Sequence, residues 1–270
     1  MINFWYKLSL ISLLFSIPIN ISSVYCHDSS QSTIEDPPEI TYSGSEHGQF
    51  KILVSGEKVG YENFSITGQT TTYTSSSFTE LTINQGNAKT SEELDRGIKG
   101  PAPSNSDTSV TYLINTELQF NENFEPTSYK VIQDVGPNQI RARVRFRPDR
   151  SDVTYFSNDN QVDKRRIELK KDVMILDDNI FHHYLILVKR YDFSEGGVQQ
   201  FIGFIPQQFL AGGISISDQG TETIEIDNQS HDLQHLLVHR GELKVDLWLD
   251  INYKLKKLSI SKSDIEVIRN

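Results

Sequence analysis

The chain has 270 residues, a formal net charge of −10 and an apolar fraction of 37%. This length suits one large domain or two small ones, and the 10% of aromatic residues can supply a core. The acidic balance argues against a general nucleic-acid binder, because phosphate contacts need an excess of Lys and Arg. It also gives no reason to expect attraction of the whole chain to an anionic membrane surface.

The N-terminus has the pattern of an export signal. Lys7 precedes LSLISLLFSIPI, an apolar run of about a dozen residues that is too short to span a bilayer comfortably. We predict a signal peptide over residues 1–26, with cleavage after Ser23 or after Cys26. A lipoprotein anchored through Cys26 is the alternative, but Tyr25 is large for the position before a lipid-modified cysteine. The predicted location is periplasmic or extracellular.

Residues 27–47 are polar and contain a Pro pair, so we predict a flexible leader. A β domain is predicted over residues 48–262, with a long loop at 84–108 and a C-terminal tail at 263–270. Its first strands are QFKILVSG and KVGYENFSITG, and turn signals then recur at the spacing that is typical of antiparallel barrels and sandwiches. Pro206 should end its strand or place it at an edge.

One segment, about residues 178–191, predicts a helix instead. Asp177 or Asp178 would cap it, Lys189 and Arg190 would lie in its last turn, and its apolar residues point nearly all round. Such a helix is buried or lies in an apolar groove. The fold class predicted is therefore mainly β: one antiparallel sheet of about a dozen strands, curled into an unclosed barrel, with this helix on the concave side.

The histidines of SHDLQHLLVHR allow two interpretations. On a helix, His231, His235 and His239 would share one side and could bind a metal ion. On a strand, each four-residue step spans about 13 Å, which no single ion bridges. The alternating LKVDLWLD that follows the Arg240-Gly241-Glu242 connection favours a hairpin and hence a strand.

Other candidate residues have simple structural interpretations. His182 and His183 are adjacent, so on a helix they diverge, and one of them is expected to be buried and hydrogen-bonded to Asp177 or to a backbone group. In IRARVRFR, the arginines at 141, 143, 145 and 147 share one face of a predicted strand. These arginines could contact a polyanion or phospholipid headgroups, although a solvated face is the commoner outcome. The chain has no HExxH, GxSxG or P-loop pattern.

Several stretches together carry a resemblance: FKILVSGEKVGYENFSI, LDDNIFHHYLILVKRY, FIPQ, LWLD and KLKKLSI. They resemble uncharacterised exported bacterial proteins of unknown function, whose fold is expected to be similar to the lipoprotein carriers LolA and LolB. The resemblance covers about residues 48–262 without the long loop. It implies an antiparallel sheet curled into an unclosed barrel, with helix covering the concave side. It assigns no functional residues.

Three functions follow as hypotheses. We favour an exported, non-enzymatic protein that needs no cofactor and binds a lipid or other apolar small molecule between the sheet and its helix. Phe181, Tyr184, Leu185 and Val188 would contact that ligand. The second hypothesis is a metal-dependent hydrolase that uses His231, His235 and His239. The third is a structural envelope protein that binds an envelope partner through an edge strand or its Arg stripe.

Overall fold

Fifteen β-strands form one sheet in the computed structural model, which describes residues 45–69, 71–84, 109–169 and 172–270. The predicted signal peptide, most of the predicted leader and nearly all of the predicted long loop lie outside these residues. The strands are β1 (Glu46–Val54), β2 (Glu57–Gln69), β3 (Thr72–Asn84), β4 (Ser109–Asn121), β5 (Pro126–Val135), β6 (Asn138–Phe146), β7 (Ser151–Ser157), β8 (Asn160–Ile167), β9 (Met174–Ile175), β10 (Val198–Ile205), β11 (Leu210–Ile226), β12 (Gln229–Arg240), β13 (Leu243–Leu249), β14 (Leu255–Ile260) and β15 (Ile265–Arg269).

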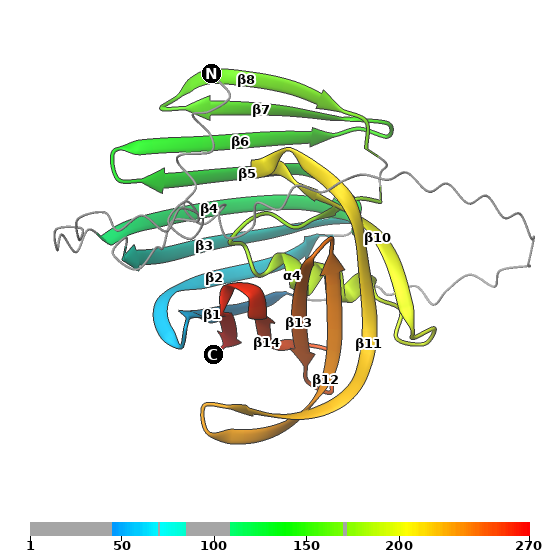
Figure 1. The fold of residues 1–270 in the computed structure, drawn as a ribbon. Helices are drawn as coiled ribbons and strands as arrows, with labels where there is room; N and C mark the ends of the chain where they lie inside the picture. Colours follow the sequence, from blue (N-terminus) through cyan, green and yellow to red (C-terminus); the bar gives the residue numbers. More distant parts are fainter. Residues whose placement is uncertain (1–44, 70, 85–108, 170–171) are drawn as a thin grey trace, which may run out of the picture.

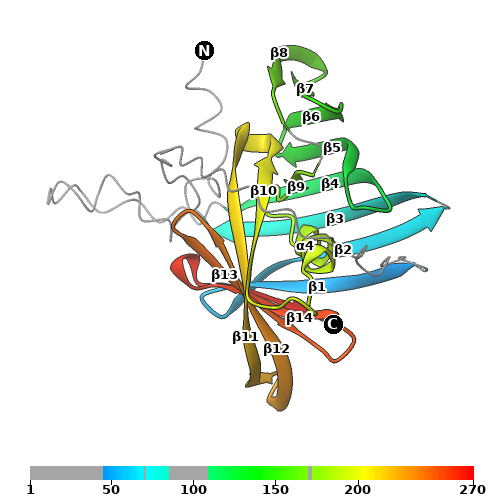
Figure 2. The ribbon, with the colours of Figure 1, turned by 90° about the vertical axis from the view of Figure 1, so that its right-hand side faces the viewer.

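The sheet is a curled meander that does not close. Its strand order is β8-β7-β6-β5-β4-β3-β2-β1-β15-β14-β13-β12-β11-β10-β9, and all pairs are antiparallel except the short parallel pair of β9 with β10. The edges are therefore β8 and β9, and the two views show the sheet curling around the segment that contains the one described helix (Figure 1, Figure 2). The predicted fold class is confirmed, with fifteen described strands in place of about a dozen.

The C-terminal residues differ from the prediction. Residues 265–269, predicted to lie in a tail, form β15, which pairs with β1 on one side and with β14 on the other. Its buried Ile265 and Val267 explain why this segment joins the sheet. The last strand of the chain therefore connects the N-terminal and C-terminal halves of the sheet.

A single α-helix among the described residues lies on the concave side of the sheet. This helix, α4 (His183–Arg190), lies within the curve of the strands, and its first six residues are all buried (Figure 2). It begins five residues later than predicted: its N-cap is His182, with no side-chain cap, and Asp177 and Asp178 lie upstream of it. Two short 3-10 helices, η2 (Pro206–Gln208) and η3 (Ser261–Ser263), complete the described elements, and Pro206 ends β10 as predicted.

The inner face, which we define as the face toward α4, carries the main core. Alternate residues of each strand point to it, as Tyr112, Ile114, Thr116, Leu118 and Phe120 do on β4. This core runs continuously from β1 to β15 and takes in the apolar side chains of α4. Among the described residues, no helix is long and apolar enough to cross a membrane.

Gly60 allows the backbones of β2 and β3 to approach each other closely. A Cβ at this position of β2 would lie 1.9 Å from the backbone oxygen of Glu80 on β3. Only glycine fits there without separating the two strands. The tight pairing sets the position of Glu62, two residues further along β2 on the same face.

Candidate functional site

The three histidines that suggested a metal site lie along a strand. His231, His235 and His239 all belong to β12, where they pair with Ile224, Gly220 and Ser215 of β11. Successive histidines are thus about 13 Å apart at the usual rise of an extended strand. Among the described residues, no group of three His, Cys, Asp or Glu side chains is placed to hold a metal ion. The helical interpretation was therefore wrong, and the hairpin interpretation is confirmed by the pairing of β12 with β13.

His235 belongs to a hydrogen-bonded network on the outer face of the sheet. Its Nε2 lies 2.9 Å from Asp246 Oδ1 and its Nδ1 lies 3.1 Å from Glu222 Oε2. The ring stacks on Trp248, whose indole N–H donates to the same Glu222 oxygen. These contacts join β11, β12 and β13, so this histidine has a structural role.

The four residues predicted to contact an apolar ligand are buried in the core. Phe181, Tyr184, Leu185 and Val188 are between 1% and 8% exposed. All four belong to the continuous apolar cluster that joins the helix region to the inner face. A ligand at this position would have to replace contacts that these side chains already make with protein.

A buried carboxylate on β2 holds the start of the helix. Glu62 is fully buried, and its Oε2 accepts hydrogen bonds from the backbone N–H groups of Phe181 at 2.8 Å and His182 at 3.2 Å. Its Oε1 lies 2.6 Å from Nδ1 of His182. One side chain thus satisfies backbone donors just before α4 and fixes the orientation of an imidazole.

A second buried carboxylate, Asp177, connects the same region to β5 and to η2. The hydroxyl of Tyr129 donates to its Oδ2 at 2.7 Å, and the backbone N–H of Gln207 donates to its Oδ1 at 3.0 Å. The backbone N–H of Asp177 in turn donates to Nδ1 of His183 at 3.3 Å. The expectation that one of the paired histidines is buried and bonded to a backbone group is therefore confirmed.

Burial dominates the electrostatics of this cluster. It raises the pKa of Asp177 to about 7, and the neighbouring carboxylate of Asp178 adds to the rise. Burial also raises the pKa of Asp178, and it lowers that of His183 well below its ordinary value, with His182 adding to the effect. His183 is therefore neutral near pH 7, and Asp177 titrates close to that pH.

Sequence reasoning missed Glu62 and Tyr129, although a signal was present. In KVGYENFSI, the inward phase of the strand is Gly60, Glu62, Phe64 and Ile66, so a carboxylate takes an apolar position. An acid on the buried phase of a strand requires a partner, and such residues mark sites where the fold departs from simple patterning. The partner itself lies about 120 residues further along the chain and has no local signal.

The predicted Arg stripe lies on the outer face of β6, and neighbouring strands extend it. We call the outer surface of β5 to β8 the cationic face; its basic residues are Lys130, Arg141, Arg143, Arg145, Arg147, Lys164 and Arg166. Arg141 pairs with Asp159, while Arg147 and Arg166 share Asp152. The inward partners in IRARVRFR, Ala142 and Val144, are 2% and 3% exposed, which confirms the predicted alternation.

Four cations of this face have no acidic partner within ion-pair distance among the described residues: Lys130, Arg143, Arg145 and Lys164. Lys130 pairs directly with Arg143 across β5 and β6, and like charges opposite each other destabilise a sheet. The guanidinium groups of Arg141 and Arg143 both lie over the ring of Phe156, at 4.5 and 5.3 Å. Glu117, opposite Lys130 on β4, borders the face. Positive charge is therefore concentrated locally on an acidic chain.

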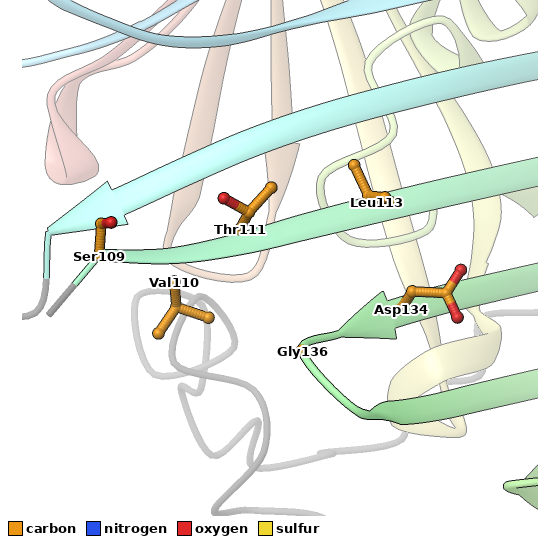
Figure 3. Close-up of a pocket in the computed structure, with 6 residues that line it drawn as sticks. All are labelled: Ser109, Val110, Thr111, Leu113, Asp134 and Gly136. Carbon is orange, nitrogen blue, oxygen red and sulfur yellow. The ribbon is translucent and has the colours of Figure 1, made fainter.

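A pocket of about 340 Å³ lies where β4 begins and β5 ends. It is lined by Ser109, Val110, Thr111, Leu113, Asp134 and Gly136, and Figure 3 shows Val110 on the opposite side of β4 from Thr111 and Leu113. Its lining contains one carboxylate and no second ionisable side chain. It has no convergent polar groups of the kind that define a binding site.

Comparisons with known proteins bear on the fold. A scan against protein-family models finds none that matches, and a search of curated proteins finds no match. Among solved structures, the chain is similar to the crystal structure of a β-barrel-like protein of domain of unknown function DUF1849 from Brucella abortus. The TM-score is 0.52 at 7% sequence identity, and the match covers 83% of this chain and 94% of that one. This similarity supports a β-barrel-like domain of unknown function.

Proposed function

We propose that the chain is an exported, non-enzymatic protein whose cationic face binds the anionic headgroups of a membrane surface. The observation that carries the proposal is the set of unpaired cations on adjacent strands. Asp and Glu outnumber Lys and Arg by 36 to 26 in the whole chain, yet four cations of this face have no carboxylate within ion-pair distance among the described residues, although Glu117 stands opposite Lys130 and Asp152 opposite Arg145 on the neighbouring strands. Keeping like charges opposite each other has a free-energy cost that an external anion would offset.

The chemistry of this face suits headgroups. Arginine binds phosphate in a bidentate manner and Lys as a point charge, and both types are present here. Phe156, half-buried beneath two guanidinium groups, adds an aromatic ring to the same surface. The non-enzymatic part of the proposal is supported by the ionisable groups near α4. These groups are too deeply buried to meet a substrate, because Glu62, Asp177, His182 and His183 are 5% exposed or less.

Vesicle binding tests the proposal. Each basic residue near an anionic surface contributes about 1 kcal/mol, so neutralising Arg143 and Arg145 to Gln should weaken binding roughly 30-fold. The measurement is co-sedimentation of the purified chain with phosphatidylcholine vesicles, with and without phosphatidylglycerol. We expect binding only to the anionic vesicles, and loss of that binding as salt is raised.

A matched variant controls for net charge. The double variant Lys58→Gln with Lys244→Gln also removes two positive charges, but from exposed positions outside the cationic face. It should bind as the unchanged chain does. All these proteins have the same N-terminal segment, so differences between them do not come from it. Equal weakening by both double variants, or no preference for anionic vesicles, would refute the proposal.

Export is part of the proposal and has its own test. The support is the charged and apolar pattern of residues 1–26. Cell fractionation followed by intact-mass measurement would show a chain shortened by residues 1–23 or 1–26, or the added mass of lipid on Cys26. A full-length chain in the soluble intracellular fraction would contradict export.

Binding of an apolar ligand beneath α4 is the second candidate, and the unclosed sheet favours it. The edges β8 and β9 are not hydrogen-bonded to each other, so they could separate without breaking a ladder of backbone bonds. Separation would expose the inner face around Phe181 and Leu185. Native mass spectrometry and lipid extraction of the purified chain would test this candidate, and a chain free of bound lipid would count against it.

A further inference from the structure

Three buried polar atoms near the start of α4 have no hydrogen-bond partner within the protein. They are Nε2 of His182, Nε2 of His183 and Oγ1 of Thr79. All three side chains belong to fully buried residues. Buried polar atoms are almost always paired with protein or with ordered water, so such a group of orphans in one region points to a ligand.

The fold places these atoms between the helix start and the inner face of β3. Thr79 pairs directly with Glu62 across β2 and β3, and Glu62 contacts His182. The ring of His182 lies parallel to Phe64 on β2, and the ring of His183 meets Tyr129 of β5 edge-on. The two imidazoles are neighbours, with centroids 4.6 Å apart.

The residues of β3 at this point are small as well as polar. Its inward side chains are Ser75, Ser77 and Thr79, whereas β2 and β4 present Phe64, Ile66, Ile114 and Leu118 to the same core. Ser77 is satisfied by Thr116, at 2.8 Å between the two hydroxyl oxygens. The hydroxyls of Ser75 and Thr79 have no hydrogen-bond partner within the protein, and Thr79 lies beside Glu62.

The hydrogen-bond directions of the two imidazoles differ. Nδ1 of His183 accepts a bond from the backbone of Asp177, so a neutral ring carries its proton on Nε2 and offers a donor. Nδ1 of His182 faces the carboxylate of Glu62, so that nitrogen carries a proton and donates. When the ring of His182 is neutral, its Nε2 is an acceptor, and a small molecule that both donates and accepts would complement the pair.

We propose that the start of α4 and the part of β3 around Thr79 enclose a hydrated internal site, in which ordered water bridges the imidazoles of His182 and His183 and the hydroxyl of Thr79. Water fits because it accepts from Nε2–H of His183 and donates to Nε2 of His182, and a buried water typically makes about three hydrogen bonds. The site lacks a third His, Cys, Asp or Glu side chain placed for a metal within the described part of the chain.

Nuclear magnetic resonance of the uniformly ¹⁵N-labelled chain tests the site. Long-range ¹H–¹⁵N correlation spectra should show the proton of His183 on Nε2 and a proton of His182 on Nδ1. Nuclear Overhauser cross-peaks should connect Nε2–H of His183 to a water that exchanges slowly with the bulk. Absence of that cross-peak, or a proton on Nδ1 of His183 with none on Nε2, would overturn the proposal.

Two valine variants separate the site from general packing effects. Thr79→Val keeps the shape but removes a hydroxyl that has no protein partner, and it should weaken the water cross-peak and shift the ring nitrogens of His182. Thr116→Val removes a hydroxyl that bonds Ser77 and should leave both readouts unchanged. Equal effects of the two variants would contradict a site at Thr79, and the measurement on the unchanged chain stands even if one variant fails to fold.

Discussion

Replacing Asp177 with Asn tests whether a buried carboxylate makes the stability of the fold depend on pH. Burial raises the pKa of Asp177 from 3.8 to about 7. Asn has the same shape and cannot titrate. Its Oδ1 can accept from the backbone of Gln207, and its amide group can donate to the hydroxyl oxygen of Tyr129.

The sign follows from proton binding. Between pH 3.8 and about 7 the folded chain holds a proton on Asp177 that the unfolded chain has released. The free energy of unfolding therefore falls as pH rises through this window and is constant above it. At about 1.4 kcal/mol per pKa unit, the full difference corresponds to about 4 kcal/mol. The loss of stability should be complete somewhat above pH 7.

The assay is denaturant unfolding followed by far-ultraviolet circular dichroism, at several pH values from about 2 to about 8. The Asn variant should gain stability relative to the unchanged chain as pH rises, by up to about 4 kcal/mol. Asp152→Asn is the control of opposite sign, because hydrogen bonds from Arg147 and Arg166 lower the pKa of Asp152. The stability that Asp152 contributes should be lost as pH falls through its lowered pKa. A pH-independent difference between the unchanged chain and Asp177→Asn would refute the reasoning.

Two further predictions concern Gly60 and Glu62 on β2. Gly60→Ala should destabilise the chain by about 3 kcal/mol or more in the same unfolding assay, because its Cβ would collide with the backbone of Glu80. Gly212→Ala, where a Cβ meets nothing within 4 Å, should change stability by less than about 0.5 kcal/mol, and similar losses at both sites would be inconsistent with the packing argument. Glu62→Gln should cost about 1.5–3 kcal/mol, because three charge-assisted hydrogen bonds become neutral or mismatched. The exposed Glu57→Gln should have almost no effect, and a neutral result at both positions would rule out an anchoring role for Glu62.

The strands were predictable because their signal is local. Alternation in IRARVRFR placed Ala142 and Val144 inward, and the turn at Gly241 marked the hairpin of β12 and β13 correctly. β15 was missed because IEVIR is short and lies at the end of the chain, where a tail is the usual expectation. Its pairing with β1 joins residues more than 200 positions apart, and no local pattern encodes that distance.

The helix was placed correctly on the concave side but began too early. Asp177 and Asp178 have the pattern of N-caps, yet their carboxylates bond η2 and Tyr129 instead. The donors before the helix are satisfied by Glu62, from a strand far away in sequence. Local capping rules therefore failed where a tertiary contact supplied the cap. The same side chain, Glu62, also holds the imidazole of His182.

The unclosed barrel raises the question of what holds its two ends in place, since no backbone ladder joins β8 to β9. Side chains from one end of the sheet bind the segments next to the other end. The hydroxyl of Tyr155 on β7 donates to the backbone oxygen of Pro206 just after β10, at 2.5 Å, and Arg165 on β8 lies over the ring of Phe209 at 4.9 Å. Tyr129 and Asp177 add a third tie, from β5 to the segment after β9. These side-chain contacts join the two ends of the sheet, while β8 and β9 have no further strand paired to their outer edges among the described residues. Polar and ionisable side chains thus join the two ends of the curled sheet where its backbone does not.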